Sequence, residues 1–125
     1  MSERSSEKGE RVLLPAPAAR VLESVVEPGW TVDGACVSID PELWFPVNGG
    51  ITSRSVLEIC SGCPVRRSCL ATAIVNVEDG VWGGVQPAPR SRARAHIWRG
   101  AEPVGVLDHL LERAADIGGR RRFAA

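Results

Sequence analysis

Four cysteines constrain this chain more than any other feature of its sequence. Three of them lie within the ten residues Cys60-Ser-Gly-Cys63-Pro-Val-Arg-Arg-Ser-Cys69, and the fourth, Cys36, lies upstream. The C-x2-C spacing lets two sulfurs point at one centre across a turn, and Cys69 can join them from the helix that follows. This arrangement of thiols predicts a metal or redox site.

Three kinds of chemistry fit the spacing of the cysteines. Zinc is bound tetrahedrally by four thiolates at Zn–S distances of about 2.3 Å. A [4Fe–4S] cluster also takes four thiolates, and its larger size accommodates irregular spacing. Cys60 and Cys63 could instead form a disulfide in the metal-free chain, although the βαβ pattern typical of such redox motifs is missing. Spacing alone favours zinc first and the cluster second.

The N-terminal residues and the lengths of the apolar runs indicate in which cellular compartment the protein is expected. Residues 1–10 are charged and contain no apolar stretch of the kind found in secretory signals. No apolar run approaches the ~20 residues that span a bilayer. We therefore expect a cytoplasmic protein without membrane association, in which a reducing environment favours metal binding over structural disulfides.

The hydrophobic pattern predicts one small all-α domain built from short helices around the cysteines. Helices are expected at 18–27, 52–60, 64–77 and 103–117, and one helical turn at 41–45. The segment Gly80-Val81-Trp82-Gly83-Gly84 predicts a tight turn in which Gly80, Gly83 and Gly84 supply backbone with positive φ. We expect three regions: a disordered tail at 1–17, a cysteine domain at 18–86, and a basic, helical extension at 87–125.

Positive charge is concentrated at the C-terminal end. The net charge is zero, but residues 90–125 hold eight arginines and four acidic residues. An Arg-rich segment suits nucleic acid, and a solvated helix face explains the same charges equally well. The residues expected to contact DNA are Arg90, Arg92, Arg94 and Arg99.

Taken together, these motifs resemble the WhiB-like family of actinobacterial transcription regulators. The similarity covers about residues 30–99. It rests on C…C-x2-C-x5-C followed by Gly-Val-Trp-Gly-Gly, on Cys-x3-Asp-Pro-Glu-Leu-Trp-Phe-Pro, and on Cys-Pro-Val-Arg-Arg-x-Cys. The chain departs from the family pattern in its long Cys36–Cys60 gap, in Trp44 where Phe is more usual, and in lacking an R-G-R-P hook.

The resemblance implies a function for each group of residues. It implies a [4Fe–4S] cluster, sensitive to oxygen and nitric oxide, on Cys36, Cys60, Cys63 and Cys69. It implies binding to region 4 of the primary sigma factor of RNA polymerase through aromatic residues, which correspond here to Trp44, Phe45, Trp82 and Trp30. It also implies that the basic C-terminal part contacts promoter DNA.

Enzymatic activity is not expected. The sequence contains no H-E-x-x-H, G-x-S-x-G or Walker A pattern. His96 and His109 are expected to be surface helix residues rather than ligands. We expect a monomer that acts as a redox-responsive regulator; the alternatives are a disulfide reductase that uses the metal-free C-x2-C motif and a structural zinc adaptor.

Overall fold

The fold is entirely helical in the part of the chain that the computed structural model describes, residues 13–45 and 54–123, with the side chains of 115–123 excepted. The helices are α2 (Ala16–Glu23), the 3-10 helices η1 (Trp30–Asp33) and η2 (Pro41–Trp44), α3 (Arg54–Ser61), α4 (Arg66–Asn76), α5 (Pro87–Trp98) and α6 (Pro103–Phe123). The only pairing of β type in these residues is a single bridge between Trp82 and Val85. The predicted small all-α fold is confirmed.

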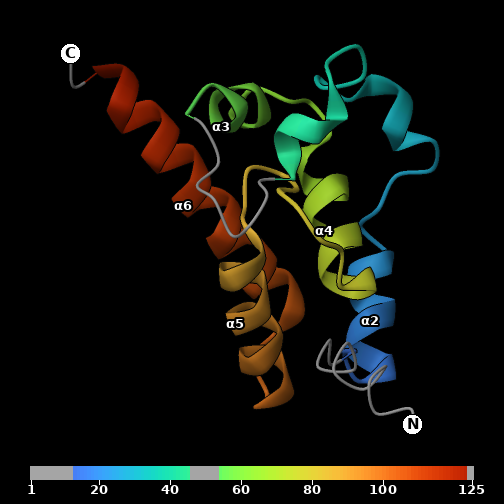
Figure 1. Ribbon diagram of the computed structural model, residues 1–125. Helices are drawn as coiled ribbons and strands as arrows, with labels where there is room; N and C mark the ends of the chain where they lie inside the picture. Colours follow the sequence, from blue (N-terminus) through green and yellow to red (C-terminus); the bar gives the residue numbers. More distant parts are fainter. Residues whose placement is uncertain (1–12, 46–53, 124–125) are drawn as a thin grey trace, which may run out of the picture.

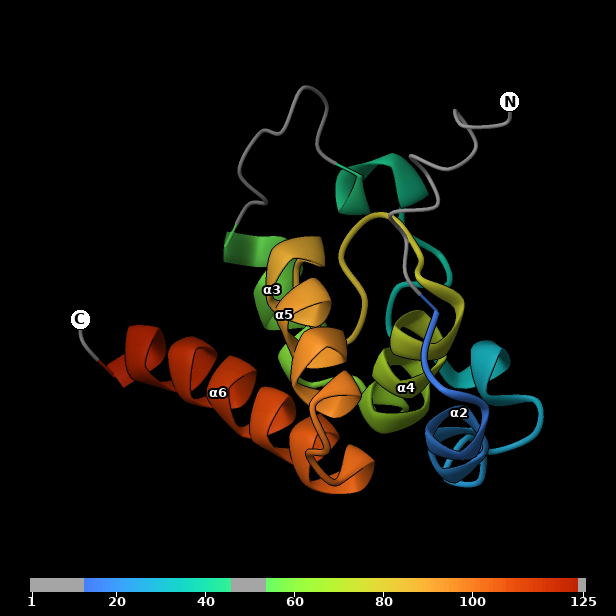
Figure 2. The same cartoon turned by 90° about the horizontal axis from the view of Figure 1, so that it is seen from below.

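Helix α4 lies at the centre, and α2, α5 and α6 all pack against it (Figure 1). Seen from below, α6 runs along one side of the molecule and α2 lies at the other (Figure 2). The main core joins these four helices through fully buried side chains that include Leu22, Leu70, Ile74 and Leu107. Burial of such side chains contributes about 1.5–3 kcal/mol each.

A second, smaller core lies where α3, η2 and the 80–85 turn meet. Its buried members are Trp44, Val56, Cys60 and Val81. The local geometry that builds η2 was predictable, because Pro41 occupies its first turn and the Asp40 carboxylate accepts a bond from the Glu42 N–H at 3.0 Å. This core fixes the loop that carries Cys36 and Trp44 against the helix that carries Cys60.

Helix α2 begins two residues before the helix predicted at 18–27 and ends at Glu23. Leu14 is buried in the main core, and α2 begins at Ala16 with Pro17 in its first turn. Proline is favoured at the start of a helix, because its missing N–H would have no partner there. Residues 1–12 of the predicted tail lie outside the described residues.

Two further helices differ from expectation. Helix α5 covers the basic segment of the predicted helical extension, for which no helix bounds were predicted, and α6 continues beyond Gly118-Gly119, where an end was expected. Both α5 and α6 pack on α4, so residues of the predicted extension contact the predicted cysteine domain. The domain boundaries themselves stay a prediction. In the described part of the chain, no helix has the length and apolar character needed to cross a membrane.

Candidate metal centre

Three separate segments bring the four cysteines to one cavity of about 230 Å³. Cys36 follows η1, Cys60 ends α3, Cys63 lies in the connection to α4, and Cys69 lies in the first turns of α4. All four are free thiols. The α3–α4 connection is tight because the Cys63 N–H donates to the Cys60 carbonyl at 3.0 Å. Among the described residues, no three His, Cys, Asp or Glu side chains close around a point as one metal ion requires; the cysteines instead surround the cavity.

Hydrogen-bond donors converge on the sulfurs. The Trp44 indole N–H donates to Cys60 Sγ at 3.2 Å, and the Ala35 N–H donates to Cys63 Sγ at 3.3 Å. The backbone N–H groups of Gly84 and Gly83 donate to Cys60 and Cys69. Such bonds stabilise the thiolate form, which is the form that binds metal, and they tune the potential of a bound iron–sulfur cluster.

Burial opposes ionisation of two of the thiols while they are free. It raises the pKa of Cys60, although the bonds from Trp44 and Gly84 act in the opposite direction. Burial raises the pKa of Cys69 to about 12, against a smaller effect of the Gly83 N–H. Metal binding must therefore displace protons from these sulfurs, which couples metal affinity to pH.

One cationic side chain, Arg66, lines the cavity together with the cysteines. Its guanidinium donates to the Leu111 carbonyl in α6 at 3.0 Å, while its Nε has no partner in the described part of the chain. Burial lowers the pKa of Arg66, and Cys60 and Cys63 act to raise it. The donor set fits a thiolate-bound metal group, because four thiolates carry negative charge that Arg66 and the N–H donors can offset.

The 80–85 turn reaches the sulfurs because two successive residues have left-handed backbone. Gly83 and Gly84 have φ values of 60° and 78°. A Cβ atom at Gly83 would lie 2.9 Å from Leu70 Cβ, so only glycine lets the turn sit this close to α4. The turn is tied to η2 by the Val81 N–H, which donates to the Trp44 carbonyl at 2.8 Å. Glycine at 80 is required by contact with Phe45, whose ring would lie 2.6 Å from a Cβ there.

The four aromatic residues expected to bind sigma factor all line the cysteine cavity. Trp44 is only 6% exposed, whereas Phe45 is 44% exposed. Trp30 and Trp82 are partly exposed and meet edge to face, with ring centroids 6.4 Å apart. Leu43 on the same helical turn as Trp44 is also exposed, as are Val32 and Val37, which sequence reasoning missed.

The four arginines expected to contact DNA divide into two pairs. Arg90 has no exposed surface, which contradicts its predicted contact with DNA. Its guanidinium donates to the carbonyls of Gly80, Val85 and Glu78. Burial, followed by the charge of Arg94, lowers the pKa of Arg90 to about 10.

Arg94 is only 8% exposed and donates to the Ile74 carbonyl at 3.4 Å. Arg92 and Arg99 are exposed. Arg90 and Arg94, two of the four arginines expected to contact DNA, therefore lie inside the fold. Arg90 holds the 80–85 turn, and Arg94 bonds to α4.

Comparison with known proteins identifies the family. A family model described as "Transcription factor WhiB" matches residues 30–93, which include all four cysteines and the 80–85 turn. Transcriptional regulator WhiB2 of Mycobacterium tuberculosis is 38% identical over 84 residues, which cover 66% of this chain and 93% of that protein. Transcriptional regulator WhiB of Streptomyces coelicolor is 41% identical over 69 residues, or 54% of this chain and 78% of the relative.

A shorter match reaches higher identity. Transcriptional regulator WhiB7 of Mycolicibacterium smegmatis is 48% identical over 46 residues, which cover 36% of this chain and 44% of that protein. These regulator names fit the expectation that the chain is not an enzyme. The family match spans the cysteine cavity, its N–H donors and the aromatic residues around it, and the chain belongs to the WhiB family of transcription factors.

Proposed function

We propose that this transcriptional regulator binds a [4Fe–4S] cluster and responds to oxidants and nitric oxide. The ligands are Cys36, Cys60, Cys63 and Cys69. The observation that carries the proposal is the meeting of four thiols from three segments at one cavity, with N–H donors directed at three of the sulfurs. When bound, such a cluster supplies iron that reacts with small oxidants and nitric oxide.

The protein converts this chemistry into a change of shape through the position of Cys36. Cys36 lies in the loop between η1 and η2, whereas the other three cysteines lie on or between α3 and α4. A metal group that bonds to all four ties this loop to the helices, and the binding free energy becomes folding free energy of the loop. Losing the group releases the loop and the aromatic residues that it carries.

The loop also supplies the proposed surface for region 4 of the primary sigma factor. Exposed Leu43 lies on η2, and Phe45 follows η2 directly. Trp30 and Trp82 line the cysteine cavity together with Phe45. Aromatic anchors of this kind dominate many protein interfaces. Buried Trp44 supports this surface from within. Promoter DNA is contacted by Arg92 and Arg99, whose phosphate contacts add affinity but little sequence specificity.

Metal analysis of protein purified without oxygen tests the cluster. We expect a coloured protein that contains iron and acid-labile sulfide in equal amounts, and loss of both when any of the four cysteines is replaced by serine. Ser61→Ala, which lies between Cys60 and Cys63, is the matched control and should keep the metal. A colourless protein with one zinc per chain would overturn the proposal.

Binding to isolated sigma region 4 tests the partner. Phe45→Ala and Trp82→Ala should each weaken binding by roughly 30-fold or more, as hot-spot residues do. Trp98→Ala removes an exposed aromatic side chain at the end of α5, outside the cysteine cavity, and should leave binding unchanged. If all three variants bind equally well, the aromatic surface is not the sigma interface.

A further inference from the structure

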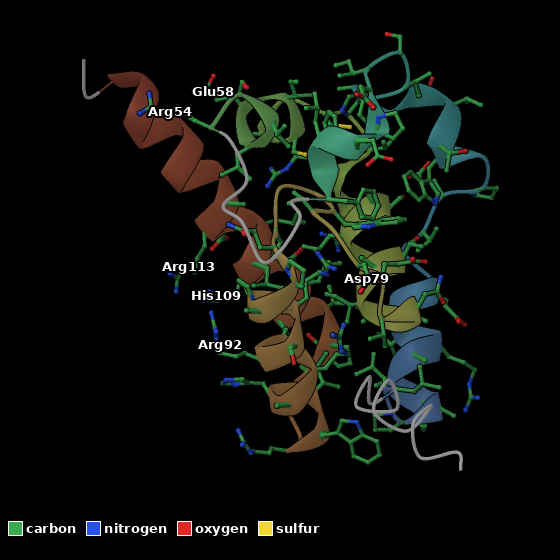
Figure 3. All side chains as sticks on the ribbon, in the orientation of Figure 1. Arg54, Glu58, Asp79, Arg92, His109 and Arg113 are labelled. Atoms are coloured by element: carbon green, nitrogen blue, oxygen red, sulfur yellow. The ribbon has the colours of Figure 1, made fainter. Side chains whose placement is uncertain are left out.

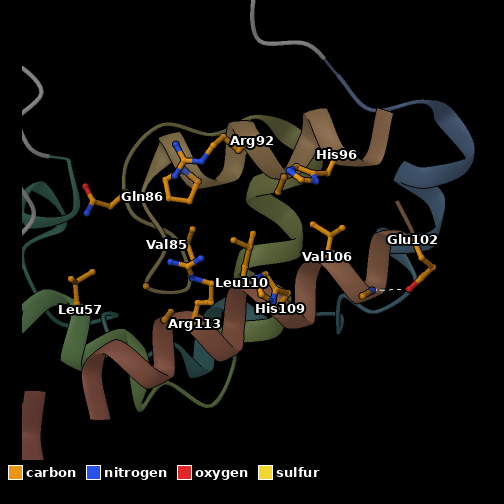
Figure 4. A pocket seen from close by; sticks show the side chains of 15 residues that line it. Leu57, Val85, Gln86, Arg92, His96, Glu102, Val106, His109, Leu110 and Arg113 are labelled. Atoms are coloured by element: carbon orange, nitrogen blue, oxygen red, sulfur yellow. Dashed lines mark hydrogen bonds between the residues drawn. The ribbon is translucent and has the colours of Figure 1, made fainter. Parts of the chain in front are cut away.

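A second cavity, of about 660 Å³, lies between α5 and α6 and shares no lining residue with the cysteine cavity. Much of its apolar lining comes from Val85, Ala93, Val106 and Leu110. Figure 4 shows Leu57 and Gln86 at one end and Glu102 at the other. Its size falls within the roughly 300–1,000 Å³ that is typical of small-molecule sites.

Basic side chains line both sides of this cavity. Arg92 and His96 come from α5, and His109 and Arg113 come from α6 (Figure 4). Figure 3 shows Arg92, His109 and Arg113 gathered on one side of the molecule. All four basic residues are exposed, and none of their side chains makes a hydrogen bond or ion pair with any residue that the structure describes.

The one acidic residue of the lining, Glu102, is already engaged. Its carboxylate accepts bonds from the backbone N–H groups of Val104 at 3.0 Å and Gly105 at 2.7 Å, and so caps the start of α6. The lining therefore carries two arginines against one glutamate even when both histidines are neutral. The cavity lining therefore has a net positive charge, which an anionic ligand would offset.

From these features we propose that the α5–α6 cavity binds a small organic anion with an apolar body. Its anionic group lies between Arg92 and Arg113, and its apolar body lies along Val106 and Leu110. A DNA phosphate would pair with the same arginines but would leave the apolar lining uncovered, so the lining favours an amphipathic ligand. The inference does not rest on the cluster or on the sigma interface, and it gives Arg92 a ligand other than the DNA phosphate proposed above.

Titration of the full chain, prepared without oxygen, with decanoate tests this site by calorimetry. We expect saturable binding of one decanoate per chain, clearly weaker binding of decanol, which lacks the charge, and no measurable binding of acetate, which lacks the apolar body. Equal binding of decanol and decanoate, or binding that does not saturate, would overturn the proposal.

Substitutions locate the site. Replacing both Arg92 and Arg113 by Gln should weaken decanoate binding by about three- to tenfold, whereas Arg20→Gln on α2 should not change it. Val106→Phe, which fills the cavity without changing charge, should weaken binding independently. Unchanged affinity in both the double variant and the Val106 variant would rule the site out.

A short DNA duplex is titrated in parallel. If the duplex loses affinity for the double variant while the unsubstituted chain binds no decanoate, the two arginines belong to a nucleic-acid surface and the proposal fails.

Discussion

At the scale of single residues, Trp44 combines two effects at the metal centre. Its ring is almost fully buried and excludes water from Cys60, and its N–H donates to the Cys60 sulfur. Exclusion of water and donation to sulfur both act on the stability and potential of a thiolate-bound metal group. These two contributions can be separated by substitution.

Trp44→Phe keeps a buried aromatic ring but removes the donor. We expect the metal-loaded protein to lose its visible absorbance in air roughly two- to fivefold faster, because one hydrogen bond to sulfur is lost. Trp98→Phe is the same chemical change at an exposed indole, whose N–H donates to the Leu13 carbonyl. Equal rates for the two variants would show that the N–H of Trp44 has no influence on the metal.

The raised pKa of Cys69 predicts slow alkylation of the metal-free, folded chain. Only the thiolate reacts, so a pKa of about 12 leaves little reactive form at pH 8, and the rate should rise about tenfold per pH unit up to that pKa. Exposed Cys36 should react first. Mass spectrometry of peptides gives each rate, with urea-unfolded protein as the control. Equal rates at Cys36 and Cys69 in the folded chain at pH 8 would contradict the raised pKa of Cys69.

The cysteines of this site were predictable, but their donors were not. Thiols are recognisable by residue type and spacing, so the cysteines could be grouped from the sequence, whereas only the resemblance to the family placed Trp44 near them. The N–H groups of Ala35 and Gly83 belong to the backbone, which every residue shares. Only their fold-dependent direction makes them donors to sulfur.

At the scale of elements, the 80–85 turn is held by side chains outside it. Arg90 binds the carbonyls of Gly80 and Val85 from inside the fold, and Leu70 on α4 limits the space at Gly83. The same 80–85 segment supplies two N–H donors, from Gly83 and Gly84, to the sulfurs of the candidate metal centre. Its stability and the integrity of the site should therefore change together.

Gly83→Ala tests the close approach of the turn to α4. The added methyl group would lie 2.9 Å from Leu70 Cβ, and the alanine backbone would have to keep a φ of 60°. We therefore expect a loss of about 2–4 kcal/mol in the free energy of unfolding. Gly29→Ala shares the positive φ but meets nothing within 4 Å, and should lose only about 1–2 kcal/mol. Urea unfolding without oxygen measures both; equal losses would mean that contact with α4 is unimportant.

Arg90→Met distinguishes a structural arginine from a DNA-contacting one. Because the substitution removes three hydrogen bonds to backbone carbonyls, two of them buried, we expect the free energy of unfolding to fall by about 2–4 kcal/mol. Arg92→Met, two residues away and exposed, should change stability by less than about 0.5 kcal/mol. The reverse order of effects, measured by urea unfolding, would contradict the buried position of Arg90.

The bounds and the buried face of helix α5 could not be predicted from apolar spacing. Its buried positions are Arg90, Ala93, Arg94 and Ile97, which follow the i, i+3, i+4, i+7 spacing of a helix face. Two of the four are arginine, so a search for apolar periodicity finds no stripe there. The partners that make burial of Arg90 tolerable are carbonyls of a turn that precedes the helix, and sequence periodicity does not reveal them.

At the scale of the whole molecule, α6 connects most of the fold. It packs against α2, α3, α4 and α5, and Leu107 is fully buried in the main core. The apolar spacing of 103–117 predicted an amphipathic helix correctly, but periodicity does not say which surface such a helix covers. The division into a domain at 18–86 and an extension at 87–125 is therefore best tested by truncation.

A chain that ends at residue 101 loses Leu107 and the Leu111 carbonyl to which Arg66 bonds. We expect it to lose cooperative unfolding and to retain metal poorly, because a buried leucine alone contributes several kcal/mol. A chain that ends at residue 115 keeps both groups and should unfold cooperatively, with metal retained. Urea unfolding and iron content measure the outcome; normal behaviour of the shorter chain would make the extension a separable unit.

Gly84 lies where the cysteine helix α3 and helix α6 come close together. A Cβ atom there would lie 3.3 Å from Cys60 Cβ on one side and 3.8 Å from Ala114 Cβ of α6 on the other. Cys60 lies inside the matched region 30–93, and Ala114 lies outside it. A protein engineer who wished to graft a helix like α6 onto another member of the family would need glycine at this position, because even a methyl group would lie 3.3 Å from Cys60 Cβ on backbone with a φ of 78°.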